Sequence, residues 1–525
     1  MKSSSRIVGA VVLAAGLTLT GCSGGGGSAG GAAADGTPVP GGTLVYGTDV
    51  QPQAGGLDPY VFVGFANQNV VDQIYEPLLT KDDDGEIQPL LASSYEQVDE
   101  TTYRFVLRDG VTFSDGTPLT ADDVVFSYET MKASGATQKP LLTTLDTVTA
   151  IDDSTIQMTL SQPSGAFLNL VSDSGSAYIV SRAWYTDTSP EDRQRTALGT
   201  GPFVLDQWQD NVSISLVKNT GYWDSPKPYL DGVTFEIVPD EQARFALLQQ
   251  GSADAVWLRD ASLAADAEVQ GFTTGTNAAT RGINLYLNSQ SGPLADERVR
   301  QAMSMGIDRD SIIALAANGN GQPTLVAPSG DPAALAPDGD TSNYTRDVAA
   351  AKALLTQTDD PTPTITLTYA SDASFALDVP TYEVMQQQLK DVGIDLQLQA
   401  LAWSDVLARY ATGNYTDMLA VPGVYRPDVS AYFTSFLSPG AAANKVAAEP
   451  AAEAADLLAT LQGTVDPDAR EQALADLEDY VAEQALLLVP YTQAQRQEMW
   501  SEDVHGYTAD PYTLRIHLKD AWLSE

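Results

Sequence analysis

The sequence predicts an α/β fold, because strand-like and helix-like segments alternate regularly along its second half. Short apolar β-branched runs are followed by segments whose apolar residues recur at helical spacing, and glycines end two of these helices. Alternation of this kind requires crossover connections and therefore a mostly parallel sheet. The expected order is a strand over Thr364–Ala370, a helix over Val379–Val392 ended by Gly393, a strand over Ile394–Leu401, a helix over Ser404–Thr412 stopped by Gly413, and a strand over Asp417–Val421.

The first half has a different rhythm, in which strand and helix patterns are mixed. Order is expected to begin with a strand at Gly42–Tyr46. Alternating apolar residues predict further strands, and Thr120–Asp123 resembles a capping box before a helix. The other predicted strands carry Tyr103, Phe105 and Leu107; Ile156, Met158 and Leu160; the hairpin Phe203–Trp208 and Val212–Val217; and Val233–Val238.

Helix starts in the second half are marked by aspartates. Asp296 and Asp308 each precede an apolar helical pattern, and Asp466 with Pro467 begins a later helix. A strand is expected at Leu486–Val489. The remaining tail is too short for a domain, so it must pack onto structure formed elsewhere.

The N-terminus has the pattern of an export signal. Lys2 and Arg6 precede an apolar run from Ile7 to Leu19, which is shorter than the roughly 20 residues of a membrane span. Cys22, the only cysteine in 525 residues, closes Leu-Thr-Gly-Cys, which resembles the bacterial lipobox. We expect residues 1–21 to be removed and Cys22 to be lipidated. The alternative is a simple signal with an incidental cysteine.

Residues 22–42 continue as a glycine-rich tether with a reach of about 25 Å for a flexible chain. Tether and lipid together predict an extracytoplasmic protein anchored to the outer face of a bacterial cell membrane.

Composition excludes several classes of function. A formal charge of −41 argues against nucleic-acid binding and against adhesion to anionic lipid through a basic patch. The mature chain can form no internal disulfide, and its two histidines, His505 and His517, form no zinc motif. No nucleophile elbow is present either, so we expect neither enzymatic activity nor a cofactor or bound metal. An accidental pair of catalytic carboxylates is the open alternative.

Motifs along most of the chain are similar to those of the family 5 extracellular solute-binding proteins, the peptide/nickel-type binding components of ABC importers. The most specific is the run Phe113–Val124, FSDGTPLTADDV, and the similarity covers about residues 43–520. The other matching segments are Tyr75–Leu79, Pro89–Glu96, Gly199–Phe203, Asn219–Trp223, Pro293–Ala302, Gly306–Arg309 and Val392–Ile394.

This resemblance implies a two-lobed periplasmic-binding-protein-like fold that encloses its ligand in a cleft between lobes. Lobe I is expected over 43–282 with an extra subdomain inserted at about 77–198, and lobe II over 283–489. Residues 490–525 are expected to return to lobe I. Hinge closure around the ligand is the expected motion.

In peptide-binding members of the family, an aspartate accepts the ligand's α-amino group. Here the corresponding stretch is Pro422–Phe433, and alignment places either Tyr425 or Arg426 at that position. Neither side chain accepts from an ammonium as a carboxylate does. Asp428 matches a second acidic position that is often structural in relatives, although it could still point inward. The departure favours sugars, anionic solutes or capped peptides over peptides with a free amine.

Strand ends supply the other expected ligand-binding residues. Trp257 and Arg259 follow the strand-like run Ala253–Val256, and Trp403 follows the strand ending at Leu401. Ligands of open α/β sheets bind at the carboxyl ends of strands, where aromatic faces suit sugars and peptide planes and an arginine can clamp a carboxylate. Packing within the lobes, where any protein of this size needs buried tryptophans, is the alternative role for these side chains.

The sequence therefore predicts a monomeric substrate-binding lipoprotein that delivers an oligopeptide-like or oligosaccharide solute to the permease subunits of an ABC importer. A metal-chelate binder of the nickel type, or a surface receptor on the same fold, are the alternatives.

Overall fold

The structure is a computed structural model of the 525-residue chain. It describes residues 36–524 except 54, 62–64, 83–84, 134–141, 173–176, 277–280, 325–343, 373–377, 424–427, 440, 442–443, 494–496 and 510–514. Contacts divide the chain into Met1–Thr37 and Pro38–Glu525, and both sheets and all their helices belong to the second unit. Within the described residues, no helix is long and apolar enough to cross a bilayer.

A seven-stranded mixed sheet organises the first lobe, lobe I. Its central strand β1 runs parallel to both neighbours, β10 and β11, whereas β19 from the C-terminal region lies antiparallel between β11 and β12. The predicted hairpin forms β8 and β9 at the other edge. In spatial order the strands are β12 (Thr273–Thr276), β19 (Gln497–Trp500), β11 (Ala255–Leu258), β1 (Thr43–Thr48), β10 (Gly232–Ile237), β9 (Ser213–Lys218) and β8 (Phe203–Gln209).

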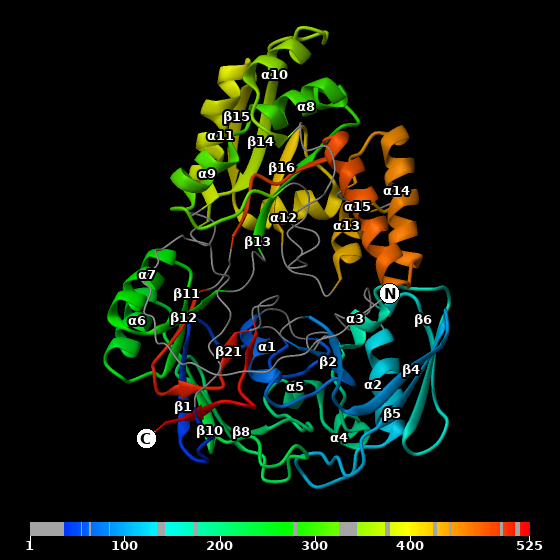
Figure 1. Cartoon of the computed structure of the whole chain (residues 1–525), viewed down its shortest axis with the longest axis vertical. Coiled ribbons are helices and arrows are strands. Elements are labelled where there is room, and N and C mark those ends of the chain that lie inside the picture. The colour runs from blue at the N-terminus through cyan, green and yellow to red at the C-terminus, as the bar shows by residue number, and fades with distance from the viewer. Residues whose placement is uncertain are drawn as a thin grey trace, which may run out of the picture. The chain divides into compact units, whose positions relative to one another are not determined.

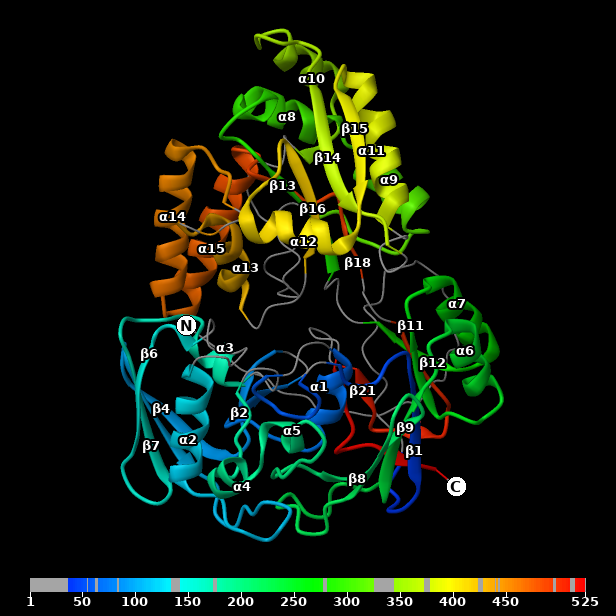
Figure 2. The ribbon, with the colours of Figure 1, turned by 180° about the vertical axis from the view of Figure 1, so that it is seen from behind.

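Between β1 and β8 the chain builds a separate four-stranded antiparallel sheet. Figure 2 shows α2 lying against this sheet, and the carboxylate of Asp123 accepts from the Thr120 backbone N–H at the helix start. The sheet order is β4 (Ala92–Asp99), β5 (Thr102–Leu107), β7 (Thr155–Leu160) and β6 (Leu145–Ala150). The remaining elements of this stretch are α1 (Phe65–Val71), β2 (Leu79–Lys81), β3 (Ile87–Pro89), α2 (Ala121–Lys132), α3 (Phe167–Ser172), α4 (Arg182–Asp187) and α5 (Pro190–Arg193).

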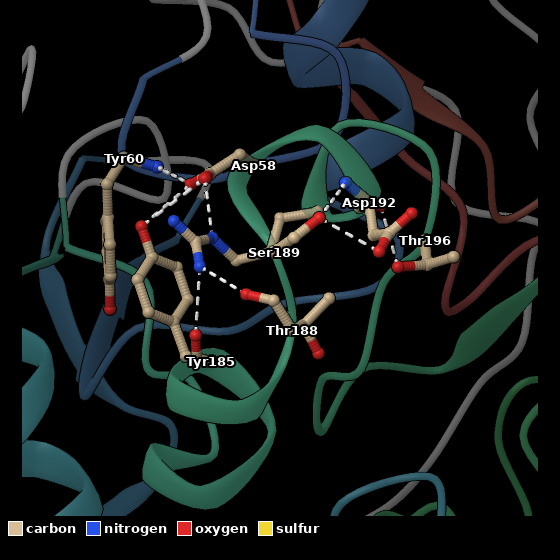
Figure 3. A network of polar contacts seen from close by, with 8 residues as sticks. Asp58, Tyr60, Tyr185, Thr188, Ser189, Asp192 and Thr196 are labelled. Carbon is tan, nitrogen blue, oxygen red and sulfur yellow. Dashed lines mark hydrogen bonds and ion pairs between the residues drawn. The ribbon is translucent and has the colours of Figure 1, made fainter.

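A buried ion pair fixes this inserted region to the segment after β1. Arg193 Nε donates to Asp58 Oδ2 at 2.9 Å, and the guanidinium also donates to the carbonyls of Tyr185 and Thr188. The Tyr185 hydroxyl and the Tyr60 backbone N–H complete the contacts of the carboxylate (Figure 3). Because the charge of Asp58 is paired and fully hydrogen-bonded, its burial is tolerated.

The second lobe, lobe II, contains a six-stranded sheet. β14 is parallel to β15 and β16, and β13 runs antiparallel to β16 and β17, so β13 is the strand of opposite direction. The predicted mostly parallel arrangement is therefore confirmed for this lobe. The strands are β15 (Asp395–Leu401), β14 (Thr364–Ala370), β16 (Met418–Gly423), β13 (Arg281–Leu287), β17 (Leu487–Leu488) and β18 (Thr492–Gln493), which also pairs with β13.

Helices surround this second sheet (Figure 1). Helix α11 contacts α8, α9 and α10, α8 also contacts α10, and α14 packs against both α13 and α15. Their bounds are α8 (Glu297–Gly306), α9 (Arg309–Ala316), α10 (Val348–Leu355), α11 (Val379–Val392), α12 (Trp403–Thr412), α13 (Val429–Leu437), α14 (Ala448–Gly463) and α15 (Pro467–Glu483). Lobe I adds α6 (Glu241–Gln249), α7 (Ala261–Gln270) and the short strands β20 (Val504–His505), β21 (Thr508–Ala509), β22 (Ile516–His517) and β23 (Trp522–Leu523); a 3₁₀ turn, η2 (Pro293–Ala295), precedes α8.

Local sequence patterns predicted the ends of several helices and strands correctly. The strand Thr364–Ala370 and the helix Val379–Val392 have the predicted bounds, and Asp296, Asp308 and Asp466 each accept a backbone N–H at a helix start. Strand β16 begins one residue later than predicted, and the carboxylate of Asp417 just before it accepts the Thr366 N–H of the neighbouring strand.

Buried apolar residues divide into cores that follow the two sheets. Two clusters contain only residues of 44–267 and 499–521, and two others contain only residues of 283–491. No described cluster mixes the two groups. The C-terminal tail packs in the first group through residues such as Val504 and Ile516, as its shortness required.

A buried carboxylate joins three of the sequence motifs in lobe I. Glu76 accepts hydrogen bonds from the Thr200 hydroxyl at 2.8 Å, the Tyr222 hydroxyl at 2.7 Å and the Trp223 indole at 3.0 Å. Burial raises the pKa of Glu76, and these three donors oppose the shift. The motifs at 75–79, 199–203 and 219–223 are therefore one packing unit.

The close approach of the same motifs leaves no room at Gly199. A Cβ at this position would lie 2.0 Å from the carbonyl oxygen of Ile74. We predict that Gly199→Ala lowers the free energy of unfolding by about 1–3 kcal/mol, because the backbone must shift. Urea unfolding followed by circular dichroism measures the change. In Gly463→Ala the new methyl meets no atom within 4 Å, so this control keeps wild-type stability; equal losses in both variants would refute the steric argument.

Candidate functional site

The chain passes between the two sheets at two places, and both passages lie at the carboxyl ends of parallel strands. In lobe I, Leu258 of β11 and Thr276 of β12 both lie opposite Gln497, where β19 begins. In lobe II, Gly423 at the end of β16 lies opposite Gly282 at the start of β13. Both sheets thus direct the carboxyl ends of their parallel strands to the crossover, the usual position of a ligand site in open α/β sheets.

Trp257 lies at this edge of lobe I. It is half-buried at the end of β11, and its indole N–H is 3.4 Å from the hydroxyl oxygen of Thr48, the last residue of the adjacent β1. The guanidinium carbons of Arg244 and Arg259 lie 5.1 and 5.6 Å from the centre of the indole ring, within the range of cation–π attraction.

The two arginines differ in what they can do. Arg244 is buried and donates to the carbonyls of Val238, Pro239 and Trp257, so it fixes the backbone around the tryptophan. Burial lowers the pKa of Arg244. Arg259 keeps 45% of its side chain exposed, and its one described ion pair is a long contact of 4.0 Å to Asp49. Arg259 is therefore the side chain here that can exchange its partner for a solute anion.

In lobe II, Trp403 likewise lies at the carboxyl end of a parallel strand, as Trp257 does in lobe I. This residue begins α12 directly after β15, and its backbone N–H donates to a carboxylate oxygen of Asp372, which follows β14. Its half-buried ring packs against the core formed around α13 to α15. The rule that placed Trp257 and Trp403 from sequence thus locates both at strand ends on the crossover side.

Asp428 is buried at the start of α13, and its oxygens already have partners. Oδ1 accepts from the Ser430 N–H at 2.9 Å and the Ser430 hydroxyl at 2.6 Å, and the Arg470 guanidinium lies 2.7 and 2.8 Å from the two oxygens. Oδ2 also accepts from the side-chain amide of Asn169 at 2.8 Å.

The electrostatics of Asp428 favour its charged form. Burial alone raises the pKa of this carboxyl, but the charge of Arg470 and the hydrogen bonds from Ser430 and Asn169 outweigh it, so the pKa lies below its usual value. The carboxylate serves as helix cap and ion-pair partner within the protein. A ligand contact by Asp428 stays a prediction, and such a ligand would have to compete with these bonds.

The structure brings only part of the predicted set together. Trp257 and Arg259 are neighbours in lobe I, whereas Trp403 and Asp428 belong to lobe II. Tyr425, Arg426 and Cys22 lie outside the described residues. Sequence reasoning missed Asn169 and Arg470, although the Asp428-x-Ser430 spacing is a recognisable helix-cap signal; nothing in the sequence marks Asn169 as its partner.

A small cavity elsewhere in lobe I is a poor alternative site. It has a volume of about 70 Å³ and is lined by Glu76, Tyr222, His517 and Lys519 among others. A volume of this size holds a few water molecules but no peptide or sugar. Among the described residues, no group of three His, Cys, Asp or Glu side chains is placed to hold a metal ion.

A two-lobed α/β protein with strand ends of both lobes at the crossover has the architecture of a solute-binding protein. The profile described as "Bacterial extracellular solute-binding proteins, family 5 Middle" matches residues 86–444, about two-thirds of the chain. The chain belongs to this family, and the resemblance seen in its motifs is confirmed.

Similar proteins cover most of the chain. The oligopeptide-binding protein AppA of Bacillus subtilis is 23% identical over 433 residues, 79% of each chain, and the glutathione-binding protein GsiB of Escherichia coli K12 is 28% identical over 353 residues, 66% of this chain and 67% of GsiB. Among solved structures, NikA from Brucella suis with Fe(III)-EDTA superposes with a TM-score of 0.79 at 21% identity, over 92% of this chain and 100% of NikA. AgaA from A. tumefacien R10, solved with agropinic acid, has a TM-score of 0.74 at 25% identity, over 92% of this chain and 99% of AgaA.

The ion pair of Asp428 predicts a pH-dependent contribution to stability. The pKa in the folded state is lowered, so the stabilisation is complete above the unfolded-state pKa of about 3.9 and is lost as pH falls through the folded-state pKa. We expect Asp428→Asn to lower the free energy of unfolding by about 3 kcal/mol at pH 7, because Arg470 loses its counter-charge. Urea titrations from pH 7 to pH 3 should show this gap narrowing below about pH 4.

The exposed Asp456 supplies the control, since Asp456→Asn removes one negative charge without breaking a described ion pair. A gap for Asp428→Asn that does not change with pH would show that the ion pair does not contribute through its charge.

Proposed function

We propose that the protein is the substrate-binding component of an ABC importer. It captures a small solute between its two lobes and delivers it to permease subunits in the membrane. The observation that carries this proposal is the meeting of the carboxyl ends of β1, β11 and β12 with those of β14, β15 and β16 at the crossover. Membership in the family of extracellular solute-binding proteins supports it.

The solute is oligopeptide-like or an oligosaccharide in this proposal. Trp257 and Trp403 offer one aromatic ring from each lobe, which suits peptide planes and sugar rings. Relatives are named for oligopeptides and glutathione, and solved relatives carry agropinic acid and Fe(III)-EDTA. Because Asp428 is engaged by Arg470, Ser430 and Asn169, we infer that a free ligand amine is not what this site selects.

Metal-chelate binding is the second candidate. The NikA structure with Fe(III)-EDTA favours it, since an anionic chelate would be met by arginines such as Arg259 rather than by metal-ligating side chains.

A ligand screen tests the proposal. We expect one solute class to raise the melting temperature and to change tryptophan fluorescence on closure. At a solute concentration of 100 times Kd, the free energy of unfolding should rise by about 2.7 kcal/mol. The screen compares matched peptides with free and acetylated N-termini, oligosaccharides and metal chelates. Stabilisation by free peptides alone, lost on acetylation, would contradict the inference about the amine. Absence of any stabilising solute would contradict solute capture.

Arginine variants sharpen this screen. Arg259→Ala and Arg426→Ala should each weaken the solute found by roughly ten- to a hundredfold, the loss of a charge-assisted hydrogen bond of about 1.5–3 kcal/mol. Arg104→Ala, which removes an exposed arginine of β5 that pairs with Glu96, is the control and keeps wild-type affinity.

Anchoring is proposed to depend on Cys22. We expect Cys22→Ser to release the protein from the membrane and abolish uptake, because no lipid can be attached, while solute affinity stays unchanged. Fractionation, uptake of labelled solute and calorimetric titration measure the three properties. Reduced affinity in the released protein would contradict this division of labour between anchor and binding unit.

A further inference from the structure

Two hydrogen bonds join the lobes at a point between α3 and the helices α13 to α15. The side-chain amide of Asn169 in α3 donates to Asp428 Oδ2 at 2.8 Å, and the Gly165 N–H donates to the Gln462 carbonyl at 2.9 Å. Phe167 and Val171 of α3 are buried in the lobe I core, whereas the partners lie beside the lobe II core of α13 to α15. The contact therefore connects two separately packed bodies.

The backbone at Gly165 is pressed against the turn between α14 and α15. A Cβ at this position would lie 2.1 Å from the carbonyl oxygen of Thr464 and 2.5 Å from Nε of Arg470. Only glycine allows this approach, so the surfaces are complementary down to backbone contact.

The two sides of the contact are unequal. Asp428 is held inside lobe II by Arg470 and by its own helix cap at Ser430, and Arg470 is positioned by the first turn of α15, where its N–H donates to the Asp466 carbonyl. Asn169 adds one neutral donor from lobe I. When the lobes part, the acid keeps its counter-charge, and among the described residues the hydrogen bonds exchanged for water are those of Asn169 and Gly165.

Such a contact stabilises closure without preventing opening. The net free energy of a hydrogen bond between a neutral and a charged group is modest in water. The charges of Asp428 and Arg470, which would be costly to leave unpaired, stay paired in both states.

We propose that Asn169, Asp428 and Gly165 form a closure latch, with Arg470 as the residue that positions Asp428. The latch biases the protein toward the closed arrangement and so raises its affinity for solute by slowing release, because release requires opening. The affinity effect rests on the proposed function, whereas the closure itself exists with or without a solute.

Distance measurements between the lobes test the latch directly. The Cys22→Ser chain contains no other cysteine, so Thr149→Cys in β6 and Ala459→Cys in α14, both exposed, can carry one nitroxide label each. Pulsed electron–electron double resonance without added solute should show a short distance between the two labels in the wild-type background. Asn169→Ala should populate longer distances, and Asn169→Asp, which places a second carboxylate against Asp428, should do so more strongly.

Gly165→Ala provides an independent variant, because it blocks the approach to Thr464 without changing any charge, and it should lengthen the distances as well. Asn414→Ala, at an exposed asparagine of lobe II, is the matched control and keeps the wild-type distribution. Melting temperatures within about one degree of wild type for the Asn169 variants separate loss of the latch from loss of fold, since a single half-buried hydrogen bond contributes little to global stability.

Once a solute is known, its Kd should rise about five- to tenfold in Asn169→Ala, and this rise should come from faster dissociation. Asn414→Ala should bind the solute as the wild type does. Distance distributions that are identical in wild type, Asn169→Asp and Gly165→Ala would overturn the latch and leave the proposed function untouched. Failure to find any solute, with distances that still respond to Asn169, would overturn the proposed function and keep the latch.

Discussion

The double passage of the chain between its two sheets is the constraint from which the rest of the molecule follows. One strand, β13, carries the chain into lobe II and runs against the direction of its neighbours, and β19 carries it back and lies between β11 and β12. Antiparallel pairing of these two strands forces the parallel strands on both sides to end where the passages occur. The site position is therefore set by topology before any particular side chain is chosen.

Lobe I depends on a second constraint, the burial of Glu76. Its carboxylate lies where segments separated by more than a hundred residues meet, and its three donors come from two of them. A buried acid is tolerated here because both of its oxygens accept hydrogen bonds, and Thr200, Tyr222 and Trp223 supply the donors. Tyr222 is buried in this way, and the half-buried ring of Trp223 packs against the lobe I core.

The sequence predicted local structure well where a periodic signal was closed by a cap. The helix Val379–Val392 ends at Gly393 with φ of 103°, a left-handed conformation that glycine adopts without strain, and the neighbouring strand Thr364–Ala370 was bounded by equally clear signals. The strand predicted at Leu486–Val489 forms only Leu487–Leu488, because ladder pairing with β13 rather than apolar character decides its length. Strand ends placed Trp257, Arg259 and Trp403, but Asn169 and Arg470 were beyond reach. Asn169 is 259 positions from the carboxylate that it contacts, and no local pattern encodes such a pairing.

The same carboxylate connects recognition to motion. Here Arg470 supplies the cation from within lobe II and Asn169 supplies the remaining donor from lobe I. A ligand ammonium would have to displace the guanidinium of Arg470 from the buried carboxylate of Asp428, whose pKa this pairing helps to lower. It would also have to displace the hydrogen bond from Asn169 between the lobes. In the two proposals made here, selection against a free amine and stabilisation of the closed state would both follow from this one pairing.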